Sequence, residues 1–367
     1  MRLLLTHLLV MVFLWSQGAS SALAAGTQTA ESLSLHGESA ILIDALTGQV
    51  LYEKNPDARL YPASITKIAT GIYAIENGNP DDLVTVSKKA RYEEGTRVYL
   101  GEGEQVTLRK LEYGLLMHSG NDAATAIAEH LSGTTEQFAE ELTRFVKEEI
   151  GVQNTHFTNA HGLHDPNHYT TAADMAKIAQ YAMKNPTFRE IVATNRLPWD
   201  GAEWKSELIN HNKLIRNYEG ATGVKNGFTD QAMHTLVGSA KRGETELIAV
   251  TMKAPSSDMA YRDVTAMLDY GFANFETRQI ADAGETFTRP AARKGETGAR
   301  FAAKEDLYAT VPIGTKTDIS LKPNGRLFVS AGPLTISYPL DRLDSPVEGK
   351  AAADSAASQR GQAERAY

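Results

Sequence analysis

The order of the hydrophobic patterns along the chain constrains its fold more than any other feature. Alternating patterns typical of strands lie at Ser39–Asp44 and Gln49–Tyr52, and a second pair lies at Thr235–Ala240 and Leu247–Met252. The long stretch between the two pairs carries helical patterns instead. Strands at both ends of a helical stretch favour an antiparallel sheet flanked by helices. The sequence therefore predicts an α/β (α+β) domain in which distant parts of the chain share one sheet.

The helices are predicted from apolar residues spaced three and four apart and from capping residues. One helix has its apolar face over Ile65–Ile75 and stops at Gly78. Thr171 and Asp174 form a capping box that opens a second helix, and Ser257 is expected to cap a long one. Further helices are predicted over Leu108–Met117, Asp122–Leu131 and Glu136–Ile150, and the two capped helices extend to about Met183 and Phe275.

The residue pattern changes after Thr277, where short β-like runs alternate with glycine and proline. These runs include Asp306–Val311, Asp318–Leu321 and Arg326–Val329, and they predict a small C-terminal all-β domain. The last residues are rich in Ala, Ser, Gln and charge, which favours disorder. The predicted organisation is a signal peptide at 1–24, a main domain at 25–277, a small β domain at 278–345 and a disordered tail at 346–367.

The first residues have the pattern of a secretory signal peptide. Arg2 precedes the short apolar run Leu3–Trp15, and the small residues of Ala22–Ala24 follow as a cleavage pattern. We therefore expect the mature chain to work outside the cytoplasm, in the cell wall or at the outer face of the cytoplasmic membrane. No later stretch of the sequence is apolar enough to cross a bilayer.

Composition excludes several classes of chemistry. With 42% hydrophobic residues the chain can build a packed core. Because it has no cysteine, a disulfide framework, a thiol nucleophile and a cysteine-ligated metal are excluded. The net charge is −8, or −8 − 1 = −9 after loss of Arg2, which argues against a nucleic-acid partner.

Ser64 and Lys67 are the first candidates for chemistry. Positions i and i+3 share one face of a helix, so the Lys67 amine can approach the Ser64 hydroxyl. A serine hydroxyl needs a base to become nucleophilic, and a lysine becomes that base only if burial or positive charge lowers its pKa. Taken alone, a serine three residues before a lysine is more often part of an ordinary surface helix.

Two further motifs are weak alone and informative together. Ser119–Asn121 supplies a serine that can relay a proton and an asparagine that can hold a substrate carbonyl, although these residues are also common in turns. Lys225–Gly227 supplies a cation for an anionic group and a glycine that allows close backbone approach. With Ser64–Lys67, the order S-x-x-K, S-x-N, K-x-G is the signature of penicillin-binding proteins and class A β-lactamases.

The chain resembles the low-molecular-mass penicillin-binding proteins, the serine D-alanyl-D-alanine carboxypeptidases of bacterial cell walls, from about Ser39 to Leu343. The resemblance implies the fold of the penicillin-binding proteins and β-lactamases, with a small all-β domain behind it. Besides the three motifs, it is carried by the segments Tyr61–Ser64, Asn159–Leu163, Thr171–Ala176, Asn210–Lys213 and Leu236–Ala240.

The resemblance also implies a mechanism. Lys67 would accept the proton of Ser64, which would attack the carbonyl between the two terminal D-alanines of a peptidoglycan pentapeptide stem. The backbone N–H groups of Ser64 and Phe228 would hold the oxyanion. Ser119 would pass the proton to the leaving amine, and Asn121 would steady Lys67 and the substrate amide. Water would then hydrolyse the acyl-enzyme.

Substrate and inhibitor binding follow from the same resemblance. Lys225 would attract the terminal carboxylate of the stem, with Asn226, Gly227 and Phe228 beside it, and β-lactams would acylate Ser64 and leave slowly. No cofactor is expected. The family usually has a hydroxyl residue where this chain has Asn226, which puts rate and penicillin sensitivity in doubt more than reaction class. Family members commonly end in an amphipathic membrane anchor that this tail does not supply, so membrane association stays open.

Two other functions compete with this hypothesis. A class A-like β-lactamase needs a deacylating glutamate about 35–45 residues after the second motif. That region offers only Glu148 and Glu149, inside a predicted helix. A wall-binding protein with a degenerate site is the non-enzymatic alternative that Asn226 motivates.

A histidine cluster raises the question of a metal site. His161, His164 and His168 lie close together in the sequence with Asp165. They lie in a Gly/Pro/Asn-rich segment and are not accompanied by a helical His-Glu-x-x-His pattern. A structural loop is therefore favoured, and no metal is expected.

Overall fold

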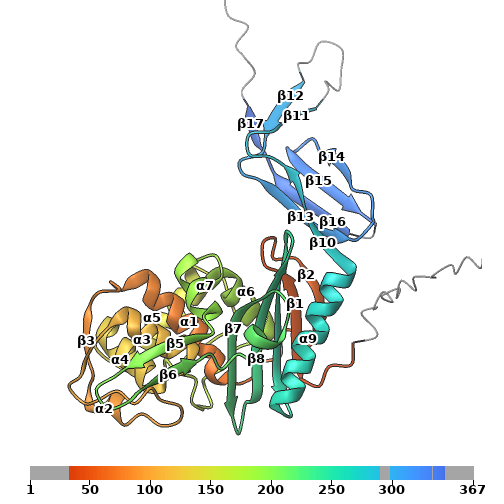
Figure 1. Ribbon diagram of the computed structural model, residues 1–367. Coiled ribbons are helices and arrows are strands. Elements are labelled where there is room, and N and C mark those ends of the chain that lie inside the picture. Colours follow the sequence, from red (N-terminus) through yellow and green to blue (C-terminus); the bar gives the residue numbers. More distant parts are fainter. Residues whose placement is uncertain (1–32, 290–297, 333, 344–367) are drawn as a thin grey trace, which may run out of the picture.

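The computed structural model describes residues 33–289, 298–332 and 334–343, so the predicted signal peptide and tail lie outside the described residues. Its central sheet is antiparallel, with strand order β2-β1-β9-β8-β7 (Figure 1). Leu42 pairs with Ala249, which brings the N-terminal hairpin beside the later one and confirms the predicted α+β sheet. The strands are β1 (Ser39–Asp44), β2 (Val50–Lys54), β7 (Ala221–Thr229), β8 (Met233–Arg242) and β9 (Thr245–Ala254).

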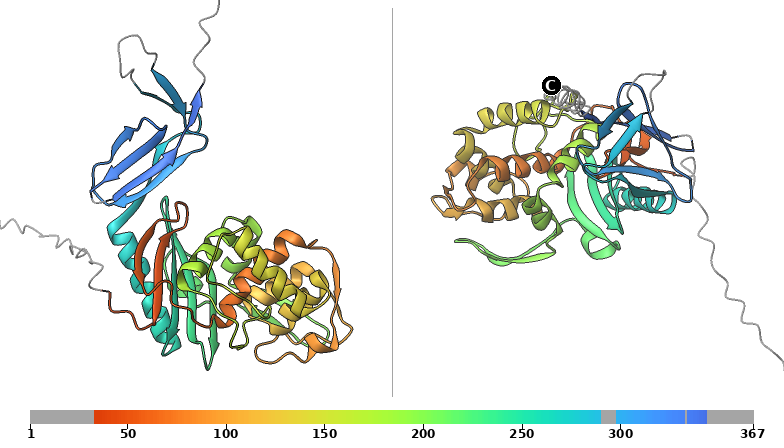
Figure 2. Two further views of the ribbon diagram at one scale, coloured as in Figure 1. Left: turned by 180° about the vertical axis from the view of Figure 1, so that it is seen from behind. Right: turned by 90° about the horizontal axis from the view of Figure 1, so that it is seen from above.

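Helices cover both faces of this sheet (Figures 1 and 2). Side chains alternate across a strand, so Ala40 and Leu42 of β1 pack toward one core, whereas Ile41 and Ile43 pack toward the other. Helix α9 (Ser257–Asn274) packs on the first face. The second face is covered by a cluster of helices, α1 (Thr66–Asn77), α3 (Leu108–Met117), α4 (Asn121–Ser132), α5 (Thr135–Glu148), α6 (Ala172–Ala182) and α7 (Pro186–Ala193).

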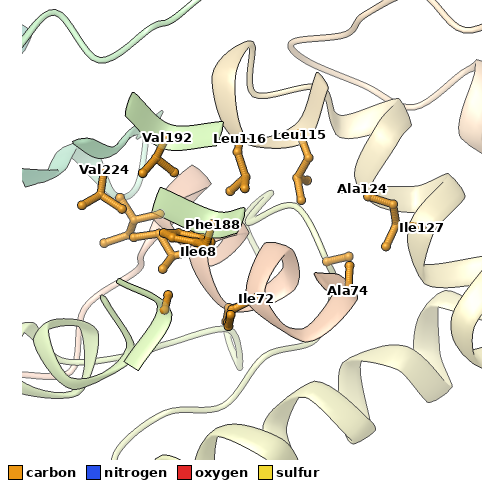
Figure 3. Close-up of a cluster of buried hydrophobic side chains, with 14 of the residues drawn as sticks. Ile68, Ile72, Ala74, Leu115, Leu116, Ala124, Ile127, Phe188, Val192 and Val224 are labelled. Atoms are coloured by element: carbon orange, nitrogen blue, oxygen red, sulfur yellow. The ribbon is translucent and has the colours of Figure 1, made fainter. Parts of the chain in front are cut away.

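Helix α1 lies at the centre of the larger core. Its residues Ile68 and Ile72 are fully buried and face a group of apolar side chains from α3 and α7 (Figure 3). Those neighbours include Leu116 and Phe188. Because a core helix is packed on several sides, its N-terminal end is a rigid platform for a reactive side chain.

The capping predictions had different outcomes. The Thr171 hydroxyl accepts a hydrogen bond from the Asp174 N–H at 3.0 Å, which confirms the predicted cap. The prediction that Ser257 caps the long helix is wrong by one position, since the Ser256 hydroxyl accepts from the Met259 N–H at 3.2 Å. Ser256 has the extended backbone that an N-cap needs, whereas Ser257 is already helical.

The segment that contains Lys225 is expected at a strand edge just before the hairpin, and it lies in β7, the strand at the edge of the central sheet. Several short elements are absent from the sequence-based expectation. They are α2 (Lys88–Arg91), α8 (Leu214–Asn217), and the hairpins β3 (Leu83–Thr85) with β4 (Gln105–Thr107) and β5 (Arg196–Asp200) with β6 (Lys205–Ile209).

The C-terminal part is all-β, as predicted, and forms three small sheets with apolar clusters of their own. It joins the central sheet through polar contacts: the Thr277 hydroxyl donates to the Asp44 carboxylate at 2.6 Å, and the hydroxyls of Thr47 and Thr310 are 2.9 Å apart. The strands are β10 (Phe275–Ala281), β11 (Thr286–Arg289), β12 (Ala299–Ala302), β13 (Leu307–Pro312), β14 (Asp318–Leu321), β15 (Arg326–Ala331), β16 (Leu334–Pro339) and β17 (Asp341–Leu343).

Within the described ranges, no helix combines the length and the apolar character that a bilayer span requires.

Glu112 on α3 carries a buried carboxyl group that links stability to pH. It is 1% exposed, and burial raises its pKa to about 7 although the Arg109 guanidinium, 3.4 Å away, opposes the shift. The unfolded carboxyl titrates near its ordinary value of about 4.3. Because the folded pKa is the higher one, the protonated native form is favoured at low pH, and stability is lost as pH rises through 7.

We therefore predict that Glu112→Gln gains stability relative to the wild type as pH rises. The difference in unfolding free energy should grow by on the order of 1–3 kcal/mol between pH 4.5 and 8, measured by urea unfolding. The matched control is Glu140→Gln, which changes an exposed glutamate of α5 and should give a difference that does not vary with pH. If the difference in unfolding free energy between Glu112→Gln and the wild type did not change with pH, the raised pKa of Glu112 would be contradicted.

Candidate active site

Ser64 lies in a 3-10 turn, Ala63–Ile65, that runs directly into α1. Ala63 has a left-handed φ of +52°, a conformation that costs a non-glycine residue about 1–3 kcal/mol and persists only under surrounding constraint. Two glycines provide that constraint. A Cβ on Gly162 would lie 1.9 Å from the Ala63 carbonyl oxygen, and one on Gly227 would lie 2.6 Å from the Ser64 nitrogen. The absence of side chains therefore lets two distant segments close around Ser64.

Lys67 is fully buried one helical turn from Ser64. Its Nζ is 3.2 Å from Ser64 Oγ, and it donates to Asn121 Oδ1 at 2.6 Å and to the His161 carbonyl at 2.7 Å. An uncharged amine has two N–H groups and one lone pair. The two oxygen acceptors match the N–H groups, which leaves the lone pair for the Ser64 hydroxyl.

Electrostatics favour this uncharged form of Lys67. Burial lowers the pKa of its amine well below the usual value, and the nearby Lys225 ammonium lowers it further. The carboxylates of Asp122 and Glu93 oppose the shift. Since burial is the largest cause, the site can hold a neutral base beside a serine hydroxyl.

Asn121 is fixed as the first residue of α4. Its Nδ2 donates to the Glu94 carbonyl at 2.6 Å, which turns Oδ1 toward Lys67. The preceding turn places Ser119, which is 5% exposed and has a left-handed φ of +66°. No hydrogen bond of Ser119 Oγ is found among the described residues, so its place in the site follows from its neighbour Asn121.

Lys225 brings a second buried cation to the site from β7. It is 1% exposed, its Nζ donates to the Asn226 carbonyl at 2.9 Å, and burial lowers its pKa to about 7. No carboxylate within the described ranges offsets this burial. A buried ammonium without a counter-ion is unfavourable unless a ligand supplies an anion.

The residues after Lys225 shape the edge of the site. Gly227 approaches the Ser64 nitrogen, as described above, and Asn226 is half-buried. Phe228 is 54% exposed, and its ring lies 4.6 Å from that of His234. Because β7 is the outermost strand of the sheet, its edge is suited to an extended peptide.

Sequence reasoning missed the contribution of the loop at His161. This residue acts through its backbone carbonyl, and the left-handed φ of +89° at Gly162 brings that loop against Ala63. The segment Asn159–Leu163 contributed to the family resemblance, but its residue types did not predict the contact between the His161 carbonyl and Lys67. The other two histidines of the cluster have separate partners: His168 Nε2 lies 2.9 Å from Thr66 Oγ1, and the His164 ring meets that of Tyr61 edge-on.

Comparison with known proteins places these residues in context. The family model described as D-alanyl-D-alanine carboxypeptidase matches residues 26–256. The chain is 36% identical over 301 residues to the D-alanyl-D-alanine carboxypeptidase DacF of Bacillus subtilis, covering 80% of this chain and 77% of that protein. It is 33% identical over 306 residues to DacA of Haemophilus influenzae, covering 77% and 74%.

A solved structure is similar over a larger share of the chain. Penicillin binding protein 5 from Haemophilus influenzae has a TM-score of 0.75 at 29% identity, covering 84% of this chain and 97% of the other. The similarity therefore extends beyond the central sheet and its helices.

Gly162 provides a test of how the site is held together. We predict that Gly162→Ala is destabilised by several kcal/mol and that Ser64 reacts at least tenfold more slowly with an activated acyl ester. The left-handed φ alone costs about 1 kcal/mol, and the clash with the Ala63 carbonyl adds to it. Urea unfolding and the acylation rate are the measurements.

Gly151→Ala is the matched control for this experiment. Gly151 also has a left-handed φ, +80°, but a Cβ there would meet nothing within 4 Å. This variant should show the backbone cost alone and keep the acylation rate. Equal effects of the two substitutions would mean that the loop does not constrain Ser64.

Proposed function

The chain belongs to the D-alanyl-D-alanine carboxypeptidase family, and from this membership we propose how its residues carry out the reaction. The protein is a serine-type D-Ala-D-Ala carboxypeptidase and a penicillin-binding protein. We assign its substrate as the pentapeptide stem of peptidoglycan. The observation that carries the assignment of roles is the buried Lys67 amine, 3.2 Å from Ser64 Oγ.

Acylation begins with proton transfer from Ser64 to Lys67. The serine oxygen attacks the carbonyl between the two terminal D-alanines, and the backbone N–H groups of Ser64 and Phe228 receive the developing oxyanion. The close approach of Gly227 to the Ser64 nitrogen supports this pairing of donors. Asn121 holds the amine through its Oδ1 while the transfer occurs.

Release of D-alanine needs a proton at the leaving nitrogen. As the C–N bond breaks, Ser119 passes the proton from Lys67 to that nitrogen, and an ester remains on Ser64. The position of Ser119 beside Asn121 supports this relay. Water then attacks the ester and gives a proton to Lys67. As the ester bond breaks, Lys67 returns that proton to Ser64 Oγ, which releases the shortened stem and restores the serine hydroxyl.

Lys225 selects the end of the chain that is cut. A terminal carboxylate supplies the anion that its buried ammonium lacks within the described residues. The substrate strand lies along β7 at Asn226–Phe228, with its penultimate carbonyl at Ser64. A β-lactam presents a carboxylate beside a reactive carbonyl in the same way, so it acylates the same serine. We place this reaction outside the cytoplasm, at the cell wall.

The nucleophile is tested by intact-mass analysis after exposure to penicillin. We predict one covalent adduct on the wild-type protein and none on Ser64→Ala, because the acyl-enzyme needs the Ser64 oxygen. Ser206→Ala, which changes an exposed serine of β6, is the control and should keep the adduct. An adduct on Ser64→Ala would show that another residue is the nucleophile.

The same preparations are assayed for D-alanine released from a pentapeptide stem. Release by the wild type and the Ser206→Ala control, with a loss of at least a thousandfold in Ser64→Ala, is the expected result. Rapid turnover of penicillin without release of D-alanine would identify a β-lactamase instead.

A further inference from the structure

Two histidines lie against each other beside the turn that carries Ser119, and the reaction described above does not use them. His118 is the C-cap residue after α3 and precedes Ser119, and His211 lies two residues after the end of β6. Their ring centroids are 4.5 Å apart, and the centroid of the Trp204 ring lies 5.4 Å from that of His118. The His211 N–H donates to the Met117 carbonyl at 3.0 Å, which holds the two segments together. The pair is thus built into the fold.

Both imidazoles are neutral at physiological pH. Burial, with a smaller contribution from the Lys225 ammonium, lowers the pKa of His118 and lowers that of His211 to about 3. A neutral imidazole has one N–H donor, so it can bind an anion without adding a charge that would repel Lys225.

One polar atom of the pair lacks the partner that burial demands. His118 Nδ1 is buried and has no hydrogen-bond partner among the described residues. Buried polar atoms are rarely left unpaired in native proteins, and an exception calls for a ligand or a water. The unpaired nitrogen of His118, the residue before Ser119, and the uncompensated Lys225 ammonium are therefore two groups that can receive an anion.

We propose that His118 and His211 bind the terminal carboxylate of the substrate together with Lys225. A carboxylate has two oxygens, and a lysine ammonium is a point charge that attracts it without fixing its rotation. An imidazole N–H on the second oxygen fixes that rotation and so directs the scissile carbonyl at Ser64. The pair makes the enzyme selective for peptides that end in a free carboxylate. This inference rests on the proposed function.

The test compares two substrates that differ only in the terminal group, a peptide ending in D-Ala-D-alanine and the same peptide ending in D-alaninamide. His118→Phe and His211→Phe keep an aromatic ring in place but remove the N–H. Since a hydrogen bond to a charged group contributes about 1.5–3 kcal/mol, kcat/KM for the acid should fall about 10- to 150-fold in at least one variant. The value for the amide should change less than threefold.

Controls separate binding from packing. His130→Phe changes a histidine near the end of α4 and should leave the acid-to-amide ratio unchanged. His118→Asn and His211→Gln retain an N–H donor and should keep most of the selectivity for the acid over the amide. If the phenylalanine variants do not fold, these two variants still test the inference. Circular dichroism and urea unfolding report on folding in each case.

Two results would overturn the inference. Equal losses with the acid and the amide would show that the pair only supports the fold of the site, and an unchanged ratio would show that it does not contact the carboxylate. Failure of the proposed function is distinguishable, because the wild-type protein itself would then release no D-alanine from the acid substrate.

Discussion

The placement of a lysine amine in a fully buried position beside a serine is the constraint on which the rest of the site depends. Lys67 reaches three oxygens, on Ser64, Asn121 and His161, that belong to three separate segments. A charged lysine in such a place would lose its hydration for only partial compensation, so burial favours the neutral amine. The base that the reaction needs is therefore a consequence of packing.

The architecture explains how this burial is maintained. Helix α1 carries Lys67, follows directly on the 3-10 turn that carries Ser64, and is surrounded by other helices, while β7 brings Gly227 against Ser64. The Lys225 ammonium lowers the pKa of Lys67, and burial in turn lowers the pKa of Lys225. In the proposed mechanism, substrate binding and base activation are coupled through these two lysines, because an anion at Lys225 would change the electric field at Lys67.

Local patterns predicted much of the fold, and long-range contacts were beyond them. The helix at Leu108–Met117 and the cap at Thr171 were found because spacing and capping are local properties. The shared sheet was expected, but the register that pairs β1 with β9 depends on residues far away in sequence. The motifs identified Ser64 and Lys67 as candidates. The His161 carbonyl could not be identified in this way, because a backbone carbonyl is present at every residue. The cap at Ser256 was missed because two adjacent serines are indistinguishable by pattern.

The protonation state of Lys67 is the most direct measure of this account. NMR titration of isotope-labelled lysine side chains, with Lys67→Arg to assign the signal, reports it without any substrate. The account predicts that the Lys67 amine is already largely uncharged at pH 7. A Lys67 signal that titrates with the ordinary lysine pKa of about 10.4 would contradict the account, since Lys67 would then be charged at neutral pH and Ser64 would have no base.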